Sequence, residues 1–303
     1  MVAVLAGGTG GAKLARGMLD VIGADELVVI ANTADDVEVY GVHVSPDPDL
    51  VTYWLADLID GRGYGIAGDT WEVMTALEAT GRPTWFRLGD RDLAMCLIRT
   101  ELLRAGVRLT EAHAAVVQAA GVDARVLPMS DDPVRTQVRA AGRWLPFQEF
   151  MIADRAASPI EAVELRGVEA ARPSPDVLDA VAAAEIVVIG PSNPIISIQP
   201  ILALGGMRDA LRASRGPVVA VSPFVGGRAV KGPTEPFMRH AGLALGAAGI
   251  AAAYEGVIDG LVCDEQLEAA PVPTLVTSTL MDEPEARRAV AAATLDFALA
   301  TQP

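Results

Sequence analysis

Short continuous apolar runs recur along the 303-residue chain, and segments with helical periodicity lie between them. Continuous apolar runs, unlike alternating ones, are typical of strands that are buried on both faces. The alternation of strands and helices predicts an α/β fold with a doubly wound, mostly parallel sheet and helices on both faces. The expected strands are 2–6, 27–32, 124–129, 186–190, 218–222, 260–263 and 274–278, and the expected helices are 12–22, 69–80, 93–105, 111–120, 175–184 and 283–300.

The stretch at about 134–170 departs from this rhythm. It includes TQVRAAGRWLPFQEFMIADR, whose alternation around Ala141 and Gly142 predicts a hairpin, and the following segment suits another strand. We therefore expect a small β-containing insertion that packs beside the main sheet. Because no repeat, low-complexity tract or flexible linker is visible, residues 1–303 are expected to form a single domain.

Charge and composition narrow the class of partner. The net charge of −15 disfavours a nucleic-acid partner, which would require a basic face, but it does not exclude nucleotides. No apolar run reaches the length of a membrane span, and no basic segment precedes the first apolar stretch. The two cysteines, Cys96 and Cys263, lack metal-site spacing. We expect a cytoplasmic protein with no membrane partner.

Polar loops follow several of the expected strands. They read GGTGGAK, NTADD, PMSDDP, GPSNP and SPFVGGRAVKGP in chain order. In open parallel sheets, ligands bind beyond the carboxyl ends of the strands, where such loops converge. The sequence therefore predicts one site built from several loops.

The first loop matches neither of two well-known phosphate-binding patterns. A dinucleotide fingerprint needs a third glycine where Lys13 stands, and a P-loop needs Ser or Thr where Leu14 stands. What remains is a glycine-rich turn whose amides suit an anion at a helix N-terminus. The alternative is a tight turn that needs glycine for its backbone geometry alone. The candidate nucleotide-binding residues of this loop are Gly8, Thr9, Gly10, Gly11 and Lys13.

Carboxylates dominate the second loop and the SPDPD segment that follows it. Asp35 and Asp36, together with Asp47 and Asp49, suit Mg²⁺, which binds one or two carboxylates plus phosphate oxygens. The alternative is that these residues cap helices and turns. Because the group lies at predicted strand ends, we favour a metal site.

The segment WFRLGDRD, residues 85–92, combines aromatic rings, arginines and carboxylates. Arginine binds phosphate bidentately and an aromatic ring stacks on a flat ligand, although Trp85 and Phe86 equally suit a core position. The three histidines stand in no hydrolase or zinc motif. These residues together indicate metal-assisted chemistry on a nucleotide or another phosphate ester.

Several of these segments together resemble the 2-phospho-L-lactate transferase family of coenzyme F-420 biosynthesis, the CofD/FbiA-type enzymes. The matching segments follow the family order as far as about residue 235, and the tail is also similar. They are GGTGGAKLARG, NTADD, SPDPD, WFRLGDRDLA, LPMSDDPVRT, LPFQEF, GPSNPIISIQPIL and VSPFVGGRAVKGP, with YEGVIDGLVCDE and TLVTSTLMDEPEARR in the tail.

The resemblance implies a homodimeric, Rossmann-like enzyme that uses Mg²⁺. It implies transfer of a phosphorylated three-carbon acid from a GDP-activated donor to the deazaflavin FO, with release of GMP. On the matching positions, Asp35 and Asp49 correspond to metal ligands, and Asp49 and Arg87 to residues that bind FO. Gly8, Thr9, Gly10, Ser192 and Asn193 correspond to nucleotide contacts, and either Asp49 or Asp36 is a candidate catalytic base.

Two other functions are consistent with parts of the pattern. Nucleotide-sugar-binding regulators of the YvcK/gluconeogenesis-factor type share the GGTG opening and a downstream acidic pair, but the SPDPD and GDRDLA segments favour the transferase. An NAD-dependent dehydrogenase is disfavoured by the missing third glycine. The sequence does not distinguish phospholactate, phosphoenolpyruvate and phosphoglycerate as the transferred group.

Overall fold

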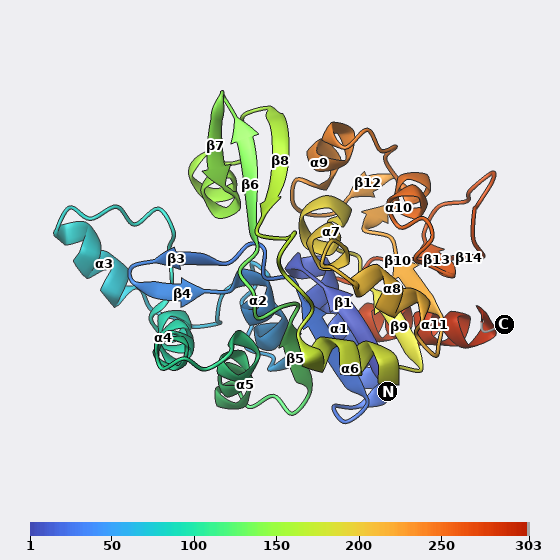
Figure 1. Ribbon diagram of the computed structural model, residues 1–303, viewed down its shortest axis with the longest axis horizontal. Coiled ribbons are helices and arrows are strands. Elements are labelled where there is room, and N and C mark those ends of the chain that lie inside the picture. Colours follow the sequence, from blue (N-terminus) through green and yellow to red (C-terminus); the bar gives the residue numbers. More distant parts are fainter. Residues whose placement is uncertain (302–303) are drawn as a thin grey trace.

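A seven-stranded parallel sheet forms the centre of the structure, a computed structural model that describes residues 1–301 (Figure 1). The sheet order is β14–β13–β10–β9–β1–β2–β5, and all neighbouring pairs are parallel. All seven predicted strands are present, so the predicted α/β class is confirmed. They are β1 (Val2–Ala6), β2 (Leu27–Ala31), β5 (Arg125–Pro128), β9 (Ile186–Ile189), β10 (Val218–Val221), β13 (Gly260–Cys263) and β14 (Thr274–Val276).

The direction of winding reverses between β1 and β9. From β1 the chain adds β2 and β5 on one side, and then returns to place β9 against the other edge of β1. The loops that leave β1 and β9 lie side by side at this point, at the carboxyl edge of the sheet, where open parallel sheets bind their ligands. The fold therefore brings GGTGG and GPSNP together, although they are far apart in sequence.

Helices cover both faces of the sheet, as predicted. Alternate strand residues face opposite sides: Val2 and Val4 belong to one apolar core, and Ala3 and Leu5 to the other. One core contains residues of α1 (Gly8–Ile22), α2 (Pro46–Leu55), α5 (Leu109–Ala119) and α11 (Pro284–Thr301). The other contains residues of α6 (Pro175–Ala183), α7 (Gln199–Leu202), α8 (Met207–Arg212) and α10 (Ala247–Ala253).

The predicted insertion is a three-stranded antiparallel sheet that projects from the main body (Figure 1). Its first hairpin turns at Ala141 and Gly142, which have φ values of 48° and 72°, as the alternation indicated. The insertion shares a small apolar core with α9 (Thr234–His240). Its elements are β6 (Arg135–Ala140), β7 (Arg143–Pro146), η1 (Glu149–Ala153) and β8 (Ile160–Arg166).

The SPDPD segment forms the start of α2, whereas we expected a short connection between elements. Pro46 takes the first helical position, where a missing amide hydrogen costs nothing, and Asp47 and Asp49 lie in the first turn, where the helix dipole favours carboxylates. The glycine run likewise forms the first turn of α1, four residues earlier than the predicted helix start.

A second small core lies beside α2 and contains residues of β3, β4, α3 and α4. The β3–β4 hairpin was not predicted, because its strands have only three residues each. No helix among residues 1–301 is both long enough and apolar enough to cross a membrane. The remaining elements are β3 (Val37–Val39), β4 (Val42–Val44), α3 (Glu72–Ala79), α4 (Asp90–Arg104), η2 (Pro194–Ile198), β11 (Phe224–Val225) and β12 (Arg228–Ala229).

Candidate active site

The loops after β1 and β9 contact each other through the glycine-rich segment. The Gly7 amide donates to the Ser192 hydroxyl at 3.1 Å. A Cβ at Gly10 would overlap the carbonyl oxygen of Pro191. Glycine at position 10 therefore allows the β9 loop to lie directly against the first turn of α1.

Asn193, in the loop after β9, offers a free hydrogen-bond donor. Its Oδ1 accepts hydrogen bonds from the amides of Ile195 and Ile196, at 2.9 and 3.3 Å. These bonds cap η2 and hold the side chain in place. Its Nδ2 is buried and has no hydrogen-bond partner within residues 1–301. A buried donor of this kind is stabilised by an acceptor on a ligand.

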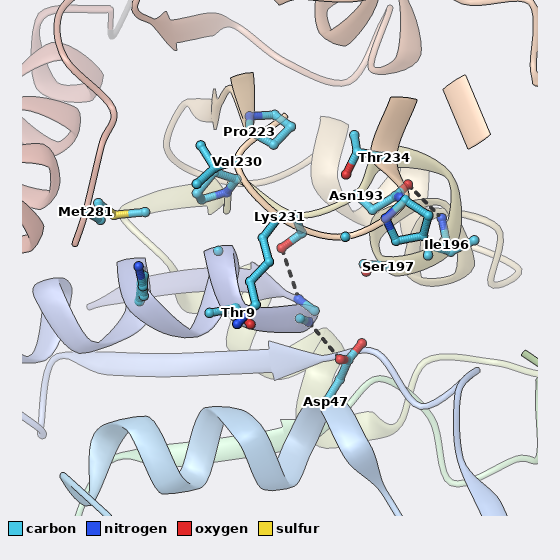
Figure 2. Close-up of a pocket in the computed structure, with 18 of the residues that line it drawn as sticks. Thr9, Asp47, Asn193, Ile196, Ser197, Pro223, Val230, Lys231, Thr234 and Met281 are labelled. Carbon is cyan, nitrogen blue, oxygen red and sulfur yellow. Dashed lines mark hydrogen bonds between the residues drawn. The ribbon is translucent and has the colours of Figure 1, made fainter. Parts of the chain in front are cut away.

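These loops surround a cavity of about 470 Å³, here called the glycine cavity. In Figure 2, Lys231 extends from its loop toward Thr9 at the start of α1, and Asp47 lies in the first turn of α2, the light-blue helix below. The lining combines helix N-terminal amides, two lysines, three carboxylates (Asp35, Asp47 and Asp282) and apolar side chains. It includes Gly7, Gly8, Thr9, Gly10, Lys13, Asp35, Asp47, Phe147, Gln148, Met151, Pro191, Ser192, Asn193, Lys231, Thr234 and Met281.

Two lysines give the glycine cavity positive charge. The Lys13 ammonium lies 2.8 Å from a carboxylate oxygen of Asp282, and Lys231 donates to the Arg62 carbonyl oxygen at 2.9 Å. Burial, and then the charge of Lys13, lower the pKa of Lys231. An anionic ligand in this cavity would offset the repulsion between the two ammonium groups.

Two buried carboxylates face the same cavity. Asp47 accepts hydrogen bonds from the Gly8 amide at 2.7 Å and from Asn32 at 2.9 Å; burial raises its pKa to about 6, an effect that these hydrogen bonds oppose. Burial, and then the charges of Asp47 and Asp36, raise the pKa of Asp35 well above its usual value. The Oδ1 atom of Asp35 is buried without a partner among the described residues. A divalent cation would satisfy this oxygen and relieve the crowding of carboxylates.

Asp36 lines neither this cavity nor the second cavity described below. Its Oδ1 accepts from the Ser45 hydroxyl at 2.7 Å, and its Oδ2 lies 2.9 Å from His43 Nε2. Ser45 is the residue immediately before α2. Asp36 therefore holds the start of the helix that carries Asp47 and Asp49.

A second cavity, of about 860 Å³, is here called the aromatic cavity. The guanidinium of Arg62 lies over the Tyr64 ring at 4.9 Å, and that of Arg87 over the Trp71 ring at 5.2 Å. A large cavity with rings and two cations suits a flat aromatic ligand with polar edges. Its lining includes Asp47, Asp49, Tyr53, Arg62, Tyr64, Trp71, Trp85, Phe86, Arg87, Asp92, Phe147, Gln148, Met151 and Ile152.

Asp49 lies in the wall of the aromatic cavity and forms a bidentate ion pair with Arg99. The two nitrogen–oxygen distances are 2.6 and 2.8 Å, and the Arg99 side chain is fully buried. Although burial disfavours its charge, the neighbouring Asp49 raises the pKa of Arg99. Since both carboxylate oxygens of Asp49 already accept from a cation, Asp35 and Asp47 fit a metal better than Asp49 does.

Within residues 1–301, one group of three side chains has potential metal-binding atoms that all lie within 4.8 Å of one another. It consists of Asp49, Asp92 and Cys96. Arg99 already supplies the positive charge at this place. Burial and the charge of Asp49 raise the pKa of the Cys96 thiol well above its usual value, so it stays protonated and is a poor ligand. We therefore do not assign a metal to this cluster.

Four residues line both cavities: Asp47, Phe147, Gln148 and Met151. Asp47 comes from the first turn of α2, and the other three come from the segment between β7 and the middle of η1. The two cavities are therefore adjacent. We call these four residues the junction.

The structure brings most of the predicted site residues to one of the two cavities. Their roles stay predictions. Gly8, Thr9, Gly10, Lys13, Asp35, Ser192 and Asn193 line the glycine cavity, Asp49 and Arg87 line the aromatic cavity, and Gly11 and Asp36 line neither.

Asp47 belonged to the carboxylate group predicted to suit a metal, but the family resemblance assigned it no role, although it lines both cavities. The signal was present, since Ser-Pro-Asp is typical of a helix start and the first turn of α2 aims Asp47 at the Gly8 amide. Gln148 was missed because its segment approaches the site only in the folded chain, whereas Lys231 belongs to the predicted loop SPFVGGRAVKGP but was given no role.

Comparison with known proteins gives a family match over almost the whole chain. The family model described as 2-phospho-L-lactate transferase CofD matches residues 2–287. A phosphoenolpyruvate transferase of Kitasatospora aureofaciens is 39% identical over an alignment 312 residues long, which covers 98% of this chain and 97% of that protein. A 2-phospho-L-lactate transferase of Methanosarcina mazei is 39% identical over 289 residues, which cover 91% of this chain and 95% of that protein.

Two solved structures of a Bacillus halodurans protein, a member of the UPF0052 family, share the fold. They have TM-scores of 0.58 and 0.63 and cover 96% and 97% of this chain, and 89% and 98% of their own chains. Their sequence identity of 18% supports a common architecture and nothing more specific.

Proposed function

The chain belongs to the 2-phospho-L-lactate transferase CofD family, and on that premise we propose that it makes a precursor of coenzyme F-420. It is a transferase. The proposed reaction moves a phosphorylated three-carbon acid from a GDP-activated donor to the deazaflavin FO and releases GMP. The observation that carries this proposal is the pair of adjacent cavities with different chemistry, which meet at four residues.

We assign the GDP portion of the donor to the glycine cavity. The amides of Thr9 and Gly10, at the N-terminus of α1, suit diphosphate oxygens. Lys13 and Lys231 add positive charge, and the unpartnered Nδ2 of Asn193 adds a donor. These groups bind negative charge without needing a basic surface elsewhere on the protein.

We assign FO to the aromatic cavity. The rings of Trp71 and Trp85 offer surfaces on which the flat deazaflavin packs, while Arg87 and Asp49 offer polar groups for its edges and its ribityl chain. Because Arg99 fixes both oxygens of Asp49, this carboxylate is held in one orientation. It is therefore suited to accept a hydrogen bond from an FO hydroxyl.

We propose that Asp35 and Asp47 hold Mg²⁺, rather than the pair Asp35 and Asp49. The free, buried oxygen of Asp35 and the neighbouring charge of Asp47 fit a divalent cation. When bound, Mg²⁺ offsets negative charge that develops on the diphosphate. Asp36 then acts as a positioning residue, through Ser45 and the start of α2, and Asp49 orients the acceptor.

In the proposed reaction, an FO ribityl oxygen bonds to the phosphorus that carries the acid. The bond from this phosphorus to the GMP phosphate breaks, the hydroxyl proton is released, and GMP leaves. The two cavities hold the reactants on opposite sides of the junction, so positioning accounts for much of the rate.

A nucleotide-sugar-binding regulator would need a nucleotide cavity but no second cavity for a flat acceptor. The aromatic cavity, joined to the glycine cavity at the junction, therefore favours the transferase. We also propose that the enzyme is a homodimer, as the family resemblance implies; its mass in solution tests this.

Turnover tests the proposed function. Purified protein with FO and Mg²⁺ is incubated with GDP esters of lactate, enolpyruvate or glycerate, each linked through its 2-hydroxyl group. We expect equal amounts of GMP and a phosphodiester-linked deazaflavin from at least one donor, measured by chromatography and mass spectrometry. Chelation of the metal, or Asp35→Asn, should remove most of this activity while FO binding stays. The absence of product from all three donors would contradict the proposal.

A further inference from the structure

The junction is where the transferred group must lie, if the proposed function is right. The donor phosphorus is attacked from the aromatic cavity, and its leaving group remains in the glycine cavity. The acid on that phosphorus therefore lies among Asp47, Phe147, Gln148 and Met151, which are the residues that face both spaces. Three of these four come from one short segment, 147–151.

We propose that Gln148 recognises the carboxylate of the transferred acid and thereby selects donors that carry one. Its primary amide offers two N–H donors, and the Gln148 side chain makes no hydrogen bond within residues 1–301. Phe147 and Met151 lie on either side of it in sequence and give the junction apolar surface. Gln148 is the only junction residue with a hydrogen-bond donor in its side chain.

The cations near the site belong to one cavity or the other and not to the junction. Lys13 and Lys231 line the glycine cavity, and Arg62 and Arg87 line the aromatic cavity. All four have partners: Lys13 pairs with Asp282, Arg62 with Asp60, and Arg87 weakly with Glu78, at 3.4 Å, and Lys231 donates to the Arg62 carbonyl oxygen. Gln148 is thus the donor best placed for a carboxylate at the junction.

The segment that carries Gln148 is held firmly in place. Phe147 and Phe150 are buried, and each packs edge-on against Phe237 of α9, with ring centroids 6.1 Å apart. Side chains of the insertion and of η2 complete this apolar core. Because this segment is well packed, a hydrogen-bond donor on it loses little conformational entropy when it binds a ligand. Its fixed position favours ligands that have an acceptor at the matching place.

Gln148 takes no part in bond making. In the proposed reaction the acid carboxylate is unchanged, while the phosphorus exchanges the GMP oxygen for the FO oxygen. The expected effect is therefore on donor binding and donor choice.

The test compares two donors that differ only at the carboxylate. One is the GDP ester of lactate, and the other is the GDP isopropyl ester, in which a methyl group replaces the carboxylate. Calorimetry measures the affinity of each for the Mg²⁺-loaded protein without FO. The variants are Gln148→Leu and, as a matched control, Gln118→Leu on the exposed side of α5, outside both cavities.

We expect Gln148→Leu to lower the affinity for the lactate ester on the order of tenfold to a hundredfold, because it removes a hydrogen bond to a charged group. The affinity for the isopropyl ester should stay nearly unchanged. Gln118→Leu should change neither affinity. An equal loss for both esters, or no loss for the lactate ester, overturns the inference. If the wild-type protein binds neither ester, the proposed function fails instead, and the inference falls with it.

Discussion

At the residue scale, the two carboxylates of SPDPD are only two positions apart in sequence, but their environments differ. Asp47 faces both cavities and accepts from two neutral donors, so it keeps capacity for a cation. Asp49 is one residue beyond a proline on the same helical turn, and both of its oxygens are bound to Arg99. Sequence spacing could not separate these roles, because Arg99 lies fifty residues further along, in α4.

The buried pair Asp49–Arg99 predicts a stability effect that a double variant isolates. Arg99→Met should lower the free energy of unfolding by about 3–5 kcal/mol, because it leaves the Asp49 carboxylate buried without its cation. The double variant Arg99→Met/Asp49→Asn should recover much of this loss, because no uncompensated charge remains. Denaturant unfolding measures both values. A double variant no more stable than Arg99→Met would contradict the assignment.

At the element scale, the contact between α1 and the loop after β9 connects the fold to the nucleotide site. Continuous apolar runs were sufficient to predict every strand of the main sheet, because its inner strands β1, β2, β9 and β10 are buried on both faces and the edge strand β14 keeps an apolar run although it is not buried. The same reasoning could not place the start of α1. Four of its first five positions are glycine or threonine, weak helix formers, and the helix begins there because tertiary contacts hold Gly7 and Gly8.

Gly10→Ala should weaken both folding and nucleotide binding. The new methyl group would push the carbonyl of Pro191 away from α1, at a cost of roughly 1–3 kcal/mol, and would displace two walls of the glycine cavity. Gly23→Ala, at the other end of α1, is the matched control: its φ of 81° makes alanine costly by roughly 1–2 kcal/mol, but it has open space and lies far from the cavity.

Thermal unfolding and calorimetry with GDP measure these two effects. Both variants should unfold more easily than the wild type, and only Gly10→Ala should bind GDP more weakly. Wild-type GDP affinity in Gly10→Ala would show that the contact with Pro191 does not shape the site.

At the scale of the whole molecule, three separate parts of the fold contribute to the site. The reversal of strand order places the glycine cavity between β1 and β9. The small core of β3, β4, α3 and α4 carries much of the aromatic cavity, and the insertion supplies most of the junction. Sequence motifs predicted the loops of each part. Their meeting depends on long-range packing, so the junction could be recognised only in the folded chain.

In the proposed reaction, both substrates bind at the same time, in adjacent cavities. The most direct test is the affinity for FO, measured through its fluorescence, with and without saturating GDP and Mg²⁺. We predict that GDP leaves the affinity for FO unchanged or makes it tighter. Asp49→Asn should lower the affinity for FO but not for GDP, and Lys231→Met should lower the affinity for GDP but not for FO. Competition between FO and GDP for one site would contradict the account.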